Sequence, residues 1–343
     1  MISKEGFNNS SAKWIKQDSV LIALAGQGKT RGKVAINRIP LTTNQSIAGI
    51  EPSNEVYYKF LYHQLTKDYL KLRLVSSGDG SRGGLNKKLL NDYAVNLSSI
   101  DEQHKLGILL SRIDNTLQLH ERKCEELALI KKVLLQKLFP KKDEIKPEVR
   151  YKNFSDAWEQ RKLGDLAEIV RGASPRPISD PKWFDDNSDI GWLRISDVTN
   201  QNGRIYYLEQ HISKLGQEKT RVITEPHLLL SIAATVGKPL INYIKTGVHD
   251  GFLIFLNPKF DLEYMYQWLE MFRPKWNKYG QPGSQVNLNS NLVRKQKIAL
   301  PSREEQQRIS SFLKQLDSLI ALHQRKLEKL KQLKKFLLQN MFI

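Results

Sequence analysis

The stretch most suggestive of chemistry is Ala23-x-x-x-x-Gly28-Lys29-Thr30, which follows a short apolar run. A phosphate-binding loop needs this spacing and also a helix that starts at the Lys-Thr pair, so that main-chain N–H groups surround the phosphate. Here the sequence Arg31–Ile36 predicts a turn and a second strand instead of a helix. The similar segment Gly237-Lys238-Pro239 lacks the Ser or Thr hydroxyl that would hold magnesium. A nucleotide hydrolase, whose activity Lys29→Ala would abolish, is therefore disfavoured, and we expect basic turns instead.

No other set of residues supports catalysis. The single cysteine, Cys124, cannot form an internal disulfide, and Cys and His residues do not cluster at metal-ligand spacing. No Ser/His/Asp or Cys/His set lies in a supporting motif, and no group of carboxylates has the pattern of a nuclease metal site. The sequence predicts no catalytic residue, no bound metal and no cofactor held by this chain.

The composition indicates a folded, basic protein. The 343 residues include 54 Lys and Arg against 36 Asp and Glu, a net charge of +18, and 40% of residues are hydrophobic. The positive excess is spread along the chain, which suits a polyanion such as double-stranded DNA but also describes a generic basic protein. There is no 18-residue apolar run and no apolar signal segment at the start, so we expect a cytoplasmic protein without membrane contact.

An internal repeat organises the chain. Residues 80–139 align without a gap onto 283–342 at a constant offset of 203, and both copies open with the pattern G-S-x-x-x-L-N. From Glu102–Phe139 against Glu305–Phe342, 16 of 38 positions are identical. The protein is thus two copies of one unit.

Each copy ends in a predicted long helix whose apolar residues recur every three or four positions, as in a coiled-coil seam. We expect the two helices to pair antiparallel as a spacer, with a homo-oligomeric coiled coil as the competing arrangement. His120 and His323 interrupt the seam at equivalent positions. They could bind a metal or sense pH, or they could be polar inserts that fix the register.

The region before each helix has a mixed pattern. Strand–turn–strand patterns, helices and short strands are expected in both copies, over 18–36, 54–73 and 93–97 in the first and over 228–241, 261–273 and 296–300 in the second. The predicted fold is α+β: two similar mixed α/β domains, each followed by a long helix. The expected boundaries are 1–100 and 159–300 for the domains, 101–139 and 301–343 for the helices, and 140–158 for the linker.

The chain resembles the specificity (S) subunit of type I restriction–modification enzymes over nearly its whole length. The resemblance rests on Trp158–Asp165 (WEQRKLGD), on Gly191–Val198 (GWLRISDV), on the repeated G-S-x-x-x-L-N loop and on the helices that begin Glu-Gln. It implies a non-catalytic subunit that recognises a bipartite double-stranded DNA site. It further implies two modification (M) subunits that methylate adenine with S-adenosylmethionine, and a restriction (R) subunit that uses ATP and magnesium.

The first half departs from the family pattern, because nothing in it matches the WEQRKLGD or GWLRISDV segments. We expect either a chain with a truncated first recognition domain or a start upstream of Met1. The alternative is a coiled-coil adaptor that holds proteins together. Such an adaptor would contact DNA only incidentally and would show no preference for a DNA sequence.

Candidate DNA contacts are basic or amide side chains in the two basic turns, in the G-S-x-x-x-L-N loops and in the second domain. Residues that the two loops share should shape the loop, and those that differ should carry specificity. The candidates are Lys29, Arg31, Lys33, Ser81, Arg82, Asn86, Arg171, Arg176, Arg194, Lys238, Gln281, Ser284, Gln285, Asn287 and Asn289. Arg122, Lys123, Arg325 and Lys326 on the helices are candidates for M-subunit contacts or for a solvated face.

Overall fold

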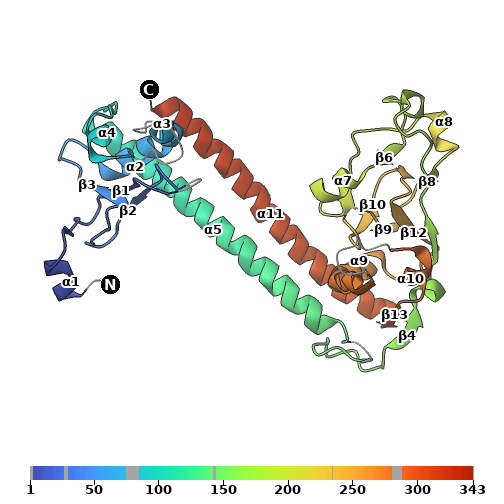
Figure 1. Cartoon of the computed structure of the whole chain (residues 1–343). Helices are drawn as coiled ribbons and strands as arrows, with labels where there is room; N and C mark the ends of the chain where they lie inside the picture. Colours follow the sequence, from blue (N-terminus) through green and yellow to red (C-terminus); the bar gives the residue numbers. More distant parts are fainter. Residues whose placement is uncertain are drawn as a thin grey trace. The chain divides into compact units, whose positions relative to one another are not determined.

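The computed structural model describes residues 3–26, 30–74, 85–141, 144–233, 235–279 and 288–342. It divides into two compact units, and Figure 1 labels most of their elements along the chain. Unit 1 comprises Met1–Cys124 and Leu322–Ile343, and unit 2 comprises Glu125–Ala321. Each unit therefore joins one mixed α/β region to a part of both long helices. In the described residues no helix is long and apolar enough to cross a membrane.

Unit 1 contains a three-stranded antiparallel sheet of order β2-β1-β3, covered by helices. Val20 and Ile22 of the central strand are fully buried, and they pack with Leu61, Leu65 and Leu72. The expected helix over 54–73 is divided in two at Asp68, whose buried carboxylate accepts a hydrogen bond from Gln64. The elements are α1 (Lys4–Asn8), β1 (Val20–Ala23), β2 (Val34–Ile36), β3 (Ile47–Ile50), α2 (Tyr58–Lys67), α3 (Tyr69–Leu74) and α4 (Lys87–Asn91).

Unit 2 contains a five-stranded sheet of order β5-β12-β9-β10-β7, a three-stranded sheet of order β6-β11-β8, and the pair β13-β4. Its elements are β4 (Glu159–Lys162), α6 (Leu163–Leu166), β5 (Glu168–Arg171), η1 (Pro181–Trp183), β6 (Gly191–Leu193), α7 (Ile195–Asn200), β7 (Arg204–Ile205), α8 (Lys214–Gln217), β8 (Arg221–Ile223), β9 (Leu228–Ser231), β10 (Pro239–Asn242), β11 (Thr246–Val248), β12 (Phe252–Leu256), α9 (Leu262–Phe272), η2 (Arg273–Tyr279), α10 (Ser290–Arg294) and β13 (Lys297–Leu300).

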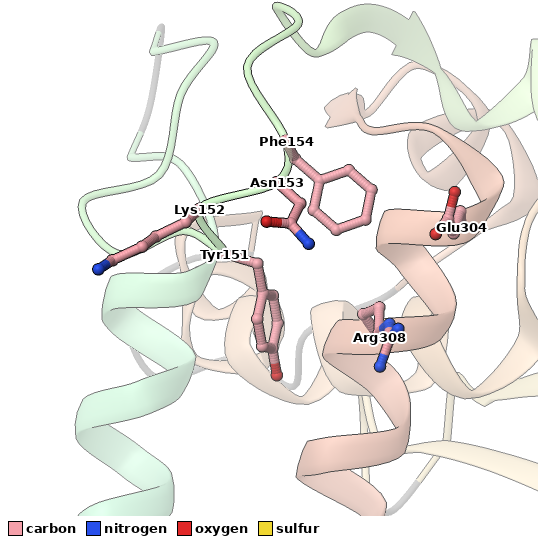
Figure 2. A pocket seen from close by; sticks show the side chains of 6 residues that line it. All are labelled: Tyr151, Lys152, Asn153, Phe154, Glu304 and Arg308. Carbon is pink, nitrogen blue, oxygen red and sulfur yellow. The ribbon is translucent and has the colours of Figure 1, made fainter.

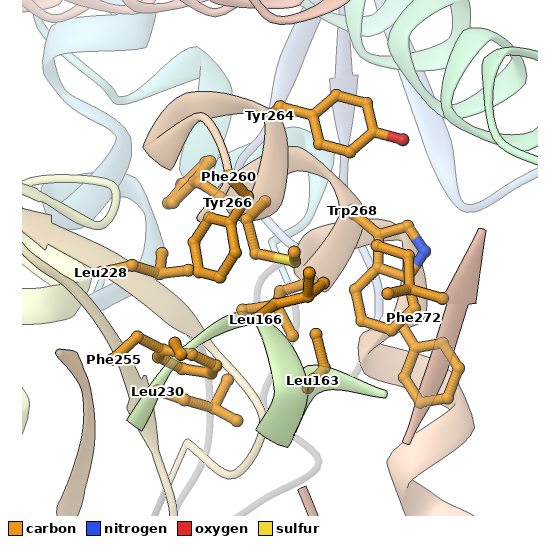
Figure 3. Packing of buried hydrophobic residues seen from close by; sticks show 14 of the residues in the cluster. Leu163, Leu166, Leu228, Leu230, Phe255, Phe260, Tyr264, Tyr266, Trp268 and Phe272 are labelled. Atoms are coloured by element: carbon orange, nitrogen blue, oxygen red, sulfur yellow. The ribbon is translucent and has the colours of Figure 1, made fainter. Parts of the chain in front are cut away.

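The main core of unit 2 lies between the five-stranded sheet and α9. The hydrophobic run FLIFL makes β12 a buried central strand, and the aromatic side of α9 packs on the same cluster. Figure 3 shows Leu163 and Leu166 of α6 among these side chains, close to Phe255 and the α9 aromatics. Short α6 is thus an integral part of the core.

The two long helices, α5 (Ile100–Leu138) and α11 (Arg303–Met341), confirm the predicted pair. In unit 1 the first part of α5, around Leu110, packs with Leu337 and Met341 near the end of α11. In unit 2 Leu138 at the end of α5 packs with Leu313 near the start of α11. Within each unit the helices are therefore antiparallel.

The polar residues in the helical seam contact each other across it. His120 Nδ1 lies 2.7 Å from His323 Nδ1, both in unit 1. Lys334 pairs with Asp114 at 2.5 Å in unit 1, and the equivalent Lys131 pairs with Asp317 in unit 2. Polar pairs of this kind favour one register over its neighbours, because a shift would leave the charges unpaired.

The prediction of a strand over 93–97 is wrong, whereas its counterpart β13 is present. β13 is a strand because it pairs with β4, and β4 is the WEQRK segment that has no match in the first half. A segment of β-favouring residues forms a ladder only where a neighbouring strand pairs with it, and the described residues contain no strand paired with 93–97. Residues 93–97 are therefore irregular in unit 1.

His63 of α2 gives unit 1 a predictable pH dependence. The side chain is fully buried, with Nε2 3.3 Å from Ser111 Oγ, while Nδ1 is 4.0 Å from Asp114, too far for a hydrogen bond. Burial, together with the charges of Lys334 and Lys59, lowers the pKa of His63 to about 3. The unfolded chain, with a pKa near 6.5, therefore binds a proton that the folded chain excludes, and stability falls as the pH drops below 6.5.

We expect His63 alone to reduce the free energy of unfolding by about 2 kcal/mol between pH 7.5 and 5. Urea unfolding followed by circular dichroism at a series of pH values measures the loss. His63→Gln, which does not titrate, should show a shallower decline that retains only what the other histidines contribute. Equal pH slopes for the wild type and this variant would contradict the assignment.

Candidate nucleic-acid interface

Two exposed arginines of unit 2 are held at one edge of the five-stranded sheet by Asp250, one through its main-chain oxygen and the other through its carboxylate. Arg171 ends β5, which pairs with β12, and Asp250 lies in the turn that leads into β12. Arg171 Nε donates to the main-chain oxygen of Asp250 at 2.6 Å, and Arg176 Nη2 donates to its carboxylate at 2.6 Å. Their side chains remain 62% and 72% exposed. We call Arg171, Ser174, Arg176, His249 and Asp250 the arginine cluster.

The backbone of the arginine cluster is fixed by local contacts. Ser174 Oγ donates to Asp250 Oδ1 at 2.9 Å and accepts from the Asp250 N–H at 3.1 Å. Gly172 allows the two segments to meet, since a Cβ there would lie 2.2 Å from the carbonyl oxygen of His249. The segments that carry the two arginines and Asp250 are thus held together by hydrogen bonds and close main-chain packing.

The electrostatics of the arginine cluster keep Asp250 charged. Burial opposes ionisation, but the Ser174 hydrogen bond and the charges of His249, Arg176 and Arg171 lower the pKa of this carboxyl. An arginine has five N–H donors, and the bonds to Asp250 leave others free to face solvent. Such pre-oriented guanidinium groups can bind phosphate oxygens, or a guanine edge in a bidentate manner.

Arg194 has a different environment. Its guanidinium contacts Asp197 at 3.0 Å and Glu209 at 2.9 Å, and hydrogen bonds to both carboxylates raise its pKa. Asp197 is buried and also accepts from the Arg194 N–H at the start of α7. The positive charge of Arg194 is therefore compensated by two carboxylates within unit 2, and its role as a DNA contact stays a prediction.

The basic turns differ in exposure. Lys33 is exposed beside β2, whereas Arg31 is half-buried. Lys238 lies in the β9–β10 turn, where burial lowers its pKa. Both turns join antiparallel strands, as expected, and in the described residues each is followed by a strand rather than by the helix that a phosphate loop requires.

The two asparagines of the repeated loop cap short helices. Asn86 Oδ1 accepts from the N–H of Leu89 at 2.9 Å, and Asn289 Oδ1 accepts from that of Leu292 at 3.0 Å. Leu85 and Leu288, which precede them, are 5% and 1% exposed. The shared leucine of the loop is thus buried and the shared asparagine caps a helix in both units. Candidates that lie outside the described residues are Lys29, Ser81, Arg82, Gln281, Ser284, Gln285 and Asn287.

The helix residues Arg122, Lys123, Arg325 and Lys326 are all exposed.

Sequence reasoning missed exposed apolar side chains that recur at the 203 offset. In unit 1 these are Leu109, Leu333 and Phe336, which are 41%, 44% and 60% exposed. In unit 2 the equivalents are Phe312, Ile130 and Val133, which are 41%, 49% and 40% exposed. The repeat shows that apolar residues recur at these positions, but it does not show that their side chains are exposed to solvent. We call the two sets the unit 1 and unit 2 apolar triads.

A cavity of about 270 Å³ lies in unit 2 between the linker and the start of α11. Figure 2 shows Tyr151 and Phe154 of the linker facing Arg308 and Glu304 on the helix. Its lining has one carboxylate and no histidine, so it lacks an acid–base pair. Across the described residues no group of three or more His, Cys, Asp or Glu side chains is arranged to hold a metal ion.

Comparisons with known proteins converge on one class. The family model described as "Type I restriction modification DNA specificity domain" matches residues 1–129 and 155–332. The type I restriction enzyme MjaVIII specificity subunit of Methanocaldococcus jannaschii is 23% identical over 340 residues, covering 92% of this chain and 76% of that protein. The EcoR124I/EcoR124II specificity subunit of Escherichia coli is 26% identical over 117 residues, 33% of this chain and 28% of that protein.

Solved structures share the fold. The type I restriction–modification S subunit from M. genitalium aligns with a TM-score of 0.66 and 14% identity, over 96% of this chain and 84% of that one. A chain from a study of complex assembly and conformational transition of the type I R-M system aligns with a TM-score of 0.56 and 16% identity, over 98% and 85%. At these identities the likeness concerns architecture.

Proposed function

Since the chain belongs to the type I restriction–modification DNA specificity family, we propose that it directs adenine methylation and restriction to a bipartite double-stranded DNA site. The observation that carries the proposal is the duplication. The family model matches each half of the chain once, and each half contributes a mixed α/β region to its own compact unit. Two similar, non-identical units are suited to two different half-sites.

In this proposal the arginine cluster is part of the half-site reader of unit 2. Its guanidinium groups are exposed but fixed, which suits contacts that must discriminate between bases. The net charge of +18 favours association with the phosphate backbone. The described part of unit 1 offers Lys33 and Arg31 for the same purpose.

The chemistry is assigned to partner subunits. Specificity subunits of this family are non-catalytic. Methyl transfer from S-adenosylmethionine belongs to M subunits, and ATP- and magnesium-dependent translocation and cleavage belong to an R subunit. This chain determines the DNA sequence on which the complex acts, and it works in the cytoplasm.

The apolar triads support docking of two M subunits on the helices. Each unit carries one triad, and exposed apolar side chains that recur in this way mark interaction sites. Because the triads are equivalent under the repeat, identical partners should occupy them. The polar candidates for M-subunit contact all lie in unit 1; they are Arg122, Lys123, Arg325 and Lys326.

We expect Leu333→Asp with Phe336→Asp to reduce the complex from two M subunits to one, because a charge in an apolar interface core is desolvated without a partner. Ile130→Asp with Val133→Asp should do the same in unit 2, and all four changes should abolish the complex. Native mass spectrometry counts the subunits. Leu74→Asp, an exposed leucine on α3, serves as the control and should leave two. Two M subunits bound to the four-fold variant would contradict this docking.

The function is tested by co-expression with M subunits in a host without adenine methylation, followed by genome-wide mapping of methylated adenine. A split, asymmetric motif supports DNA reading by both units. A symmetric split motif would indicate that two chains each use unit 2. An intact complex that leaves the genome unmethylated would overturn the proposal and leave a protein adaptor.

A further inference from the structure

In unit 1 the long helices contact each other through one residue and its own counterpart in the repeat. His120 of α5 and His323 of α11 are 203 positions apart in the chain, and their Nδ1 atoms lie 2.7 Å apart. The ring planes are inclined at 53°, so the contact is not a ring stack. Both side chains are half-buried. This N···N distance is that of a hydrogen bond, in which one Nδ1 carries the hydrogen and the other accepts it.

A metal ion has little support at this pair. Metal sites in proteins use three or more protein ligands, and in the part of the chain that the structure describes no third His, Cys, Asp or Glu completes such a set. The surroundings are also basic. Within one turn of the pair the charged or titratable side chains are Glu121, Arg122, Lys123 and Cys124 on α5 and Arg325 and Lys326 on α11. Lys331 of α11 lies 3.9 Å from Glu121 and 3.7 Å from Glu328. Cations therefore outnumber carboxylates around the imidazoles, which opposes each further positive charge.

The hydrogen bond between the two histidines depends on how many protons the pair holds. Two neutral imidazoles carry one N–H each, and the contact forms when only one of the facing Nδ1 atoms is protonated. A first added proton can go to the far Nε2 of the donating ring, which leaves the bond in place and makes it charge-assisted. A second added proton has only the accepting Nδ1 left. Two N–H groups and two positive charges then face each other, so the hydrogen bond is lost.

The electrostatics of the pair act in the same direction. Burial, followed by the charges of His323 and Lys326, lowers the pKa of His120. The unfolded chain binds both protons near pH 6.5, whereas the folded pair resists the second. The stability that this contact contributes is therefore present above pH 6.5 and is lost as the pH falls below it.

We propose that the His120–His323 pair is a pH-sensitive contact in the helical seam of unit 1, which stays closed with no added proton or one and opens when both imidazoles are charged. Opening separates the helices locally where Arg122, Lys123, Arg325 and Lys326 are exposed. Acidification therefore also changes the surface proposed for M-subunit contact. The pH-sensitive contact itself rests on neither DNA reading nor subunit docking.

The number of titration steps tests the proton coupling. The full chain is labelled with carbon-13 at the histidine Cε1 atoms and followed by NMR from about pH 8 to pH 4.5, with His120→Gln and His323→Gln to assign the two signals. We expect the pair to titrate in two steps separated by about 1 pH unit or more. In His323→Gln, His120 should titrate in a single step. His104→Gln, which changes an exposed histidine of the same helix that stacks on Tyr57, is the control and should leave both steps in place.

Amide hydrogen exchange tests the opening. After correction for the intrinsic pH dependence of exchange, rates at residues 117–124 and 322–327 should rise roughly 5- to 10-fold from pH 7 to pH 5, because one pKa unit of proton linkage changes an opening equilibrium up to tenfold. His63→Gln serves as the background, so that the buried histidine of α2 does not contribute. Adding His120→Gln with His323→Gln, whose amides can hydrogen-bond without titrating, should remove the increase.

Each result decides the proposal. Two separated steps together with acid-dependent exchange at the seam support the pH-sensitive contact. A single step near pH 6.5 for both histidines overturns it, as does exchange that rises equally with and without the two imidazoles. Two steps without any rise in exchange also overturn it, because the pair would then accept both protons and stay closed.

Discussion

Replacing Arg204 by methionine should destabilise unit 2 by about 1.5 to 3 kcal/mol, because it removes the cation shared by two half-buried carboxylates, each of which keeps a lysine partner. Arg204 is 12% exposed and contacts Glu263 at 2.7 Å and Asp317 at 3.1 Å. These contacts join β7 and α9 of the recognition region to α11. The substitution therefore also loosens the attachment of the reader to its helix.

The pH dependence of this effect has a definite sign. Burial opposes ionisation of Glu263, but the hydrogen bond and charge of Arg204, aided by Tyr243 and Lys314, lower its pKa to about 2. In the wild type this carboxylate contributes stability above pH 4.5 that is lost as the pH falls towards 2. In Arg204→Met the carboxylate can protonate at a higher pH. The difference in the free energy of unfolding between the wild type and Arg204→Met should thus become smaller from pH 7 to pH 4.

Tryptophan fluorescence during urea unfolding measures the effect selectively, because five of the six tryptophans lie in unit 2 and only Trp14 lies in unit 1. Arg161→Met is the matched control, since Arg161 is 43% exposed and pairs with exposed Glu159. That change should shift the free energy of unfolding by about 0.5 kcal/mol or less. Equal shifts for the two variants would contradict a special role for Arg204.

Local and periodic features of the fold could be predicted from sequence. The 3.5-residue apolar period and the 203 offset predicted α5 and α11 and their antiparallel pairing. Asn86 and Asn289 occupy cap positions that their residue type favours. These features depend on neighbours in the chain or on self-similarity, both of which are visible in one sequence.

Features that depend on a distant partner could not be predicted. The 93–97 segment has the composition of a strand, but its counterpart β13 is a strand only in unit 2, where it pairs with β4. Arg176 and Arg194 look alike in sequence. Arg194 meets Glu209 and Asp197, while Arg176 meets Asp250, which lies 74 residues away. Tertiary contacts therefore decide how many carboxylates an arginine meets and how much of its side chain stays exposed.

The second large effect concerns DNA. On the proposed function, Arg171→Ala with Arg176→Ala should weaken binding of the methylating complex to its own site by about 30-fold or more, since each arginine that binds a base edge is worth roughly 1 to 3 kcal/mol. Fluorescence anisotropy with duplexes that do and do not contain the mapped site measures this. Arg161→Ala, an exposed arginine outside the arginine cluster, is the control and should bind nearly as the wild type does. An unchanged affinity in the double variant would exclude the arginine cluster from the interface.

Asp250→Asn separates the two ways in which these arginines can act. The change removes a negative charge from the surface, so binding to unrelated DNA should stay equal or become tighter. It also weakens the charged contact that orients Arg176, while the main-chain oxygen that holds Arg171 is unchanged, so preference for the proper site should fall. A lower specificity ratio with undiminished non-specific affinity is the result expected if the carboxylate positions base-reading guanidinium groups. If the arginines only neutralise phosphates, Asp250→Asn will strengthen binding to both duplexes alike, and the double variant will reduce the slope of log K against log salt by about 0.9 for each phosphate that is no longer neutralised.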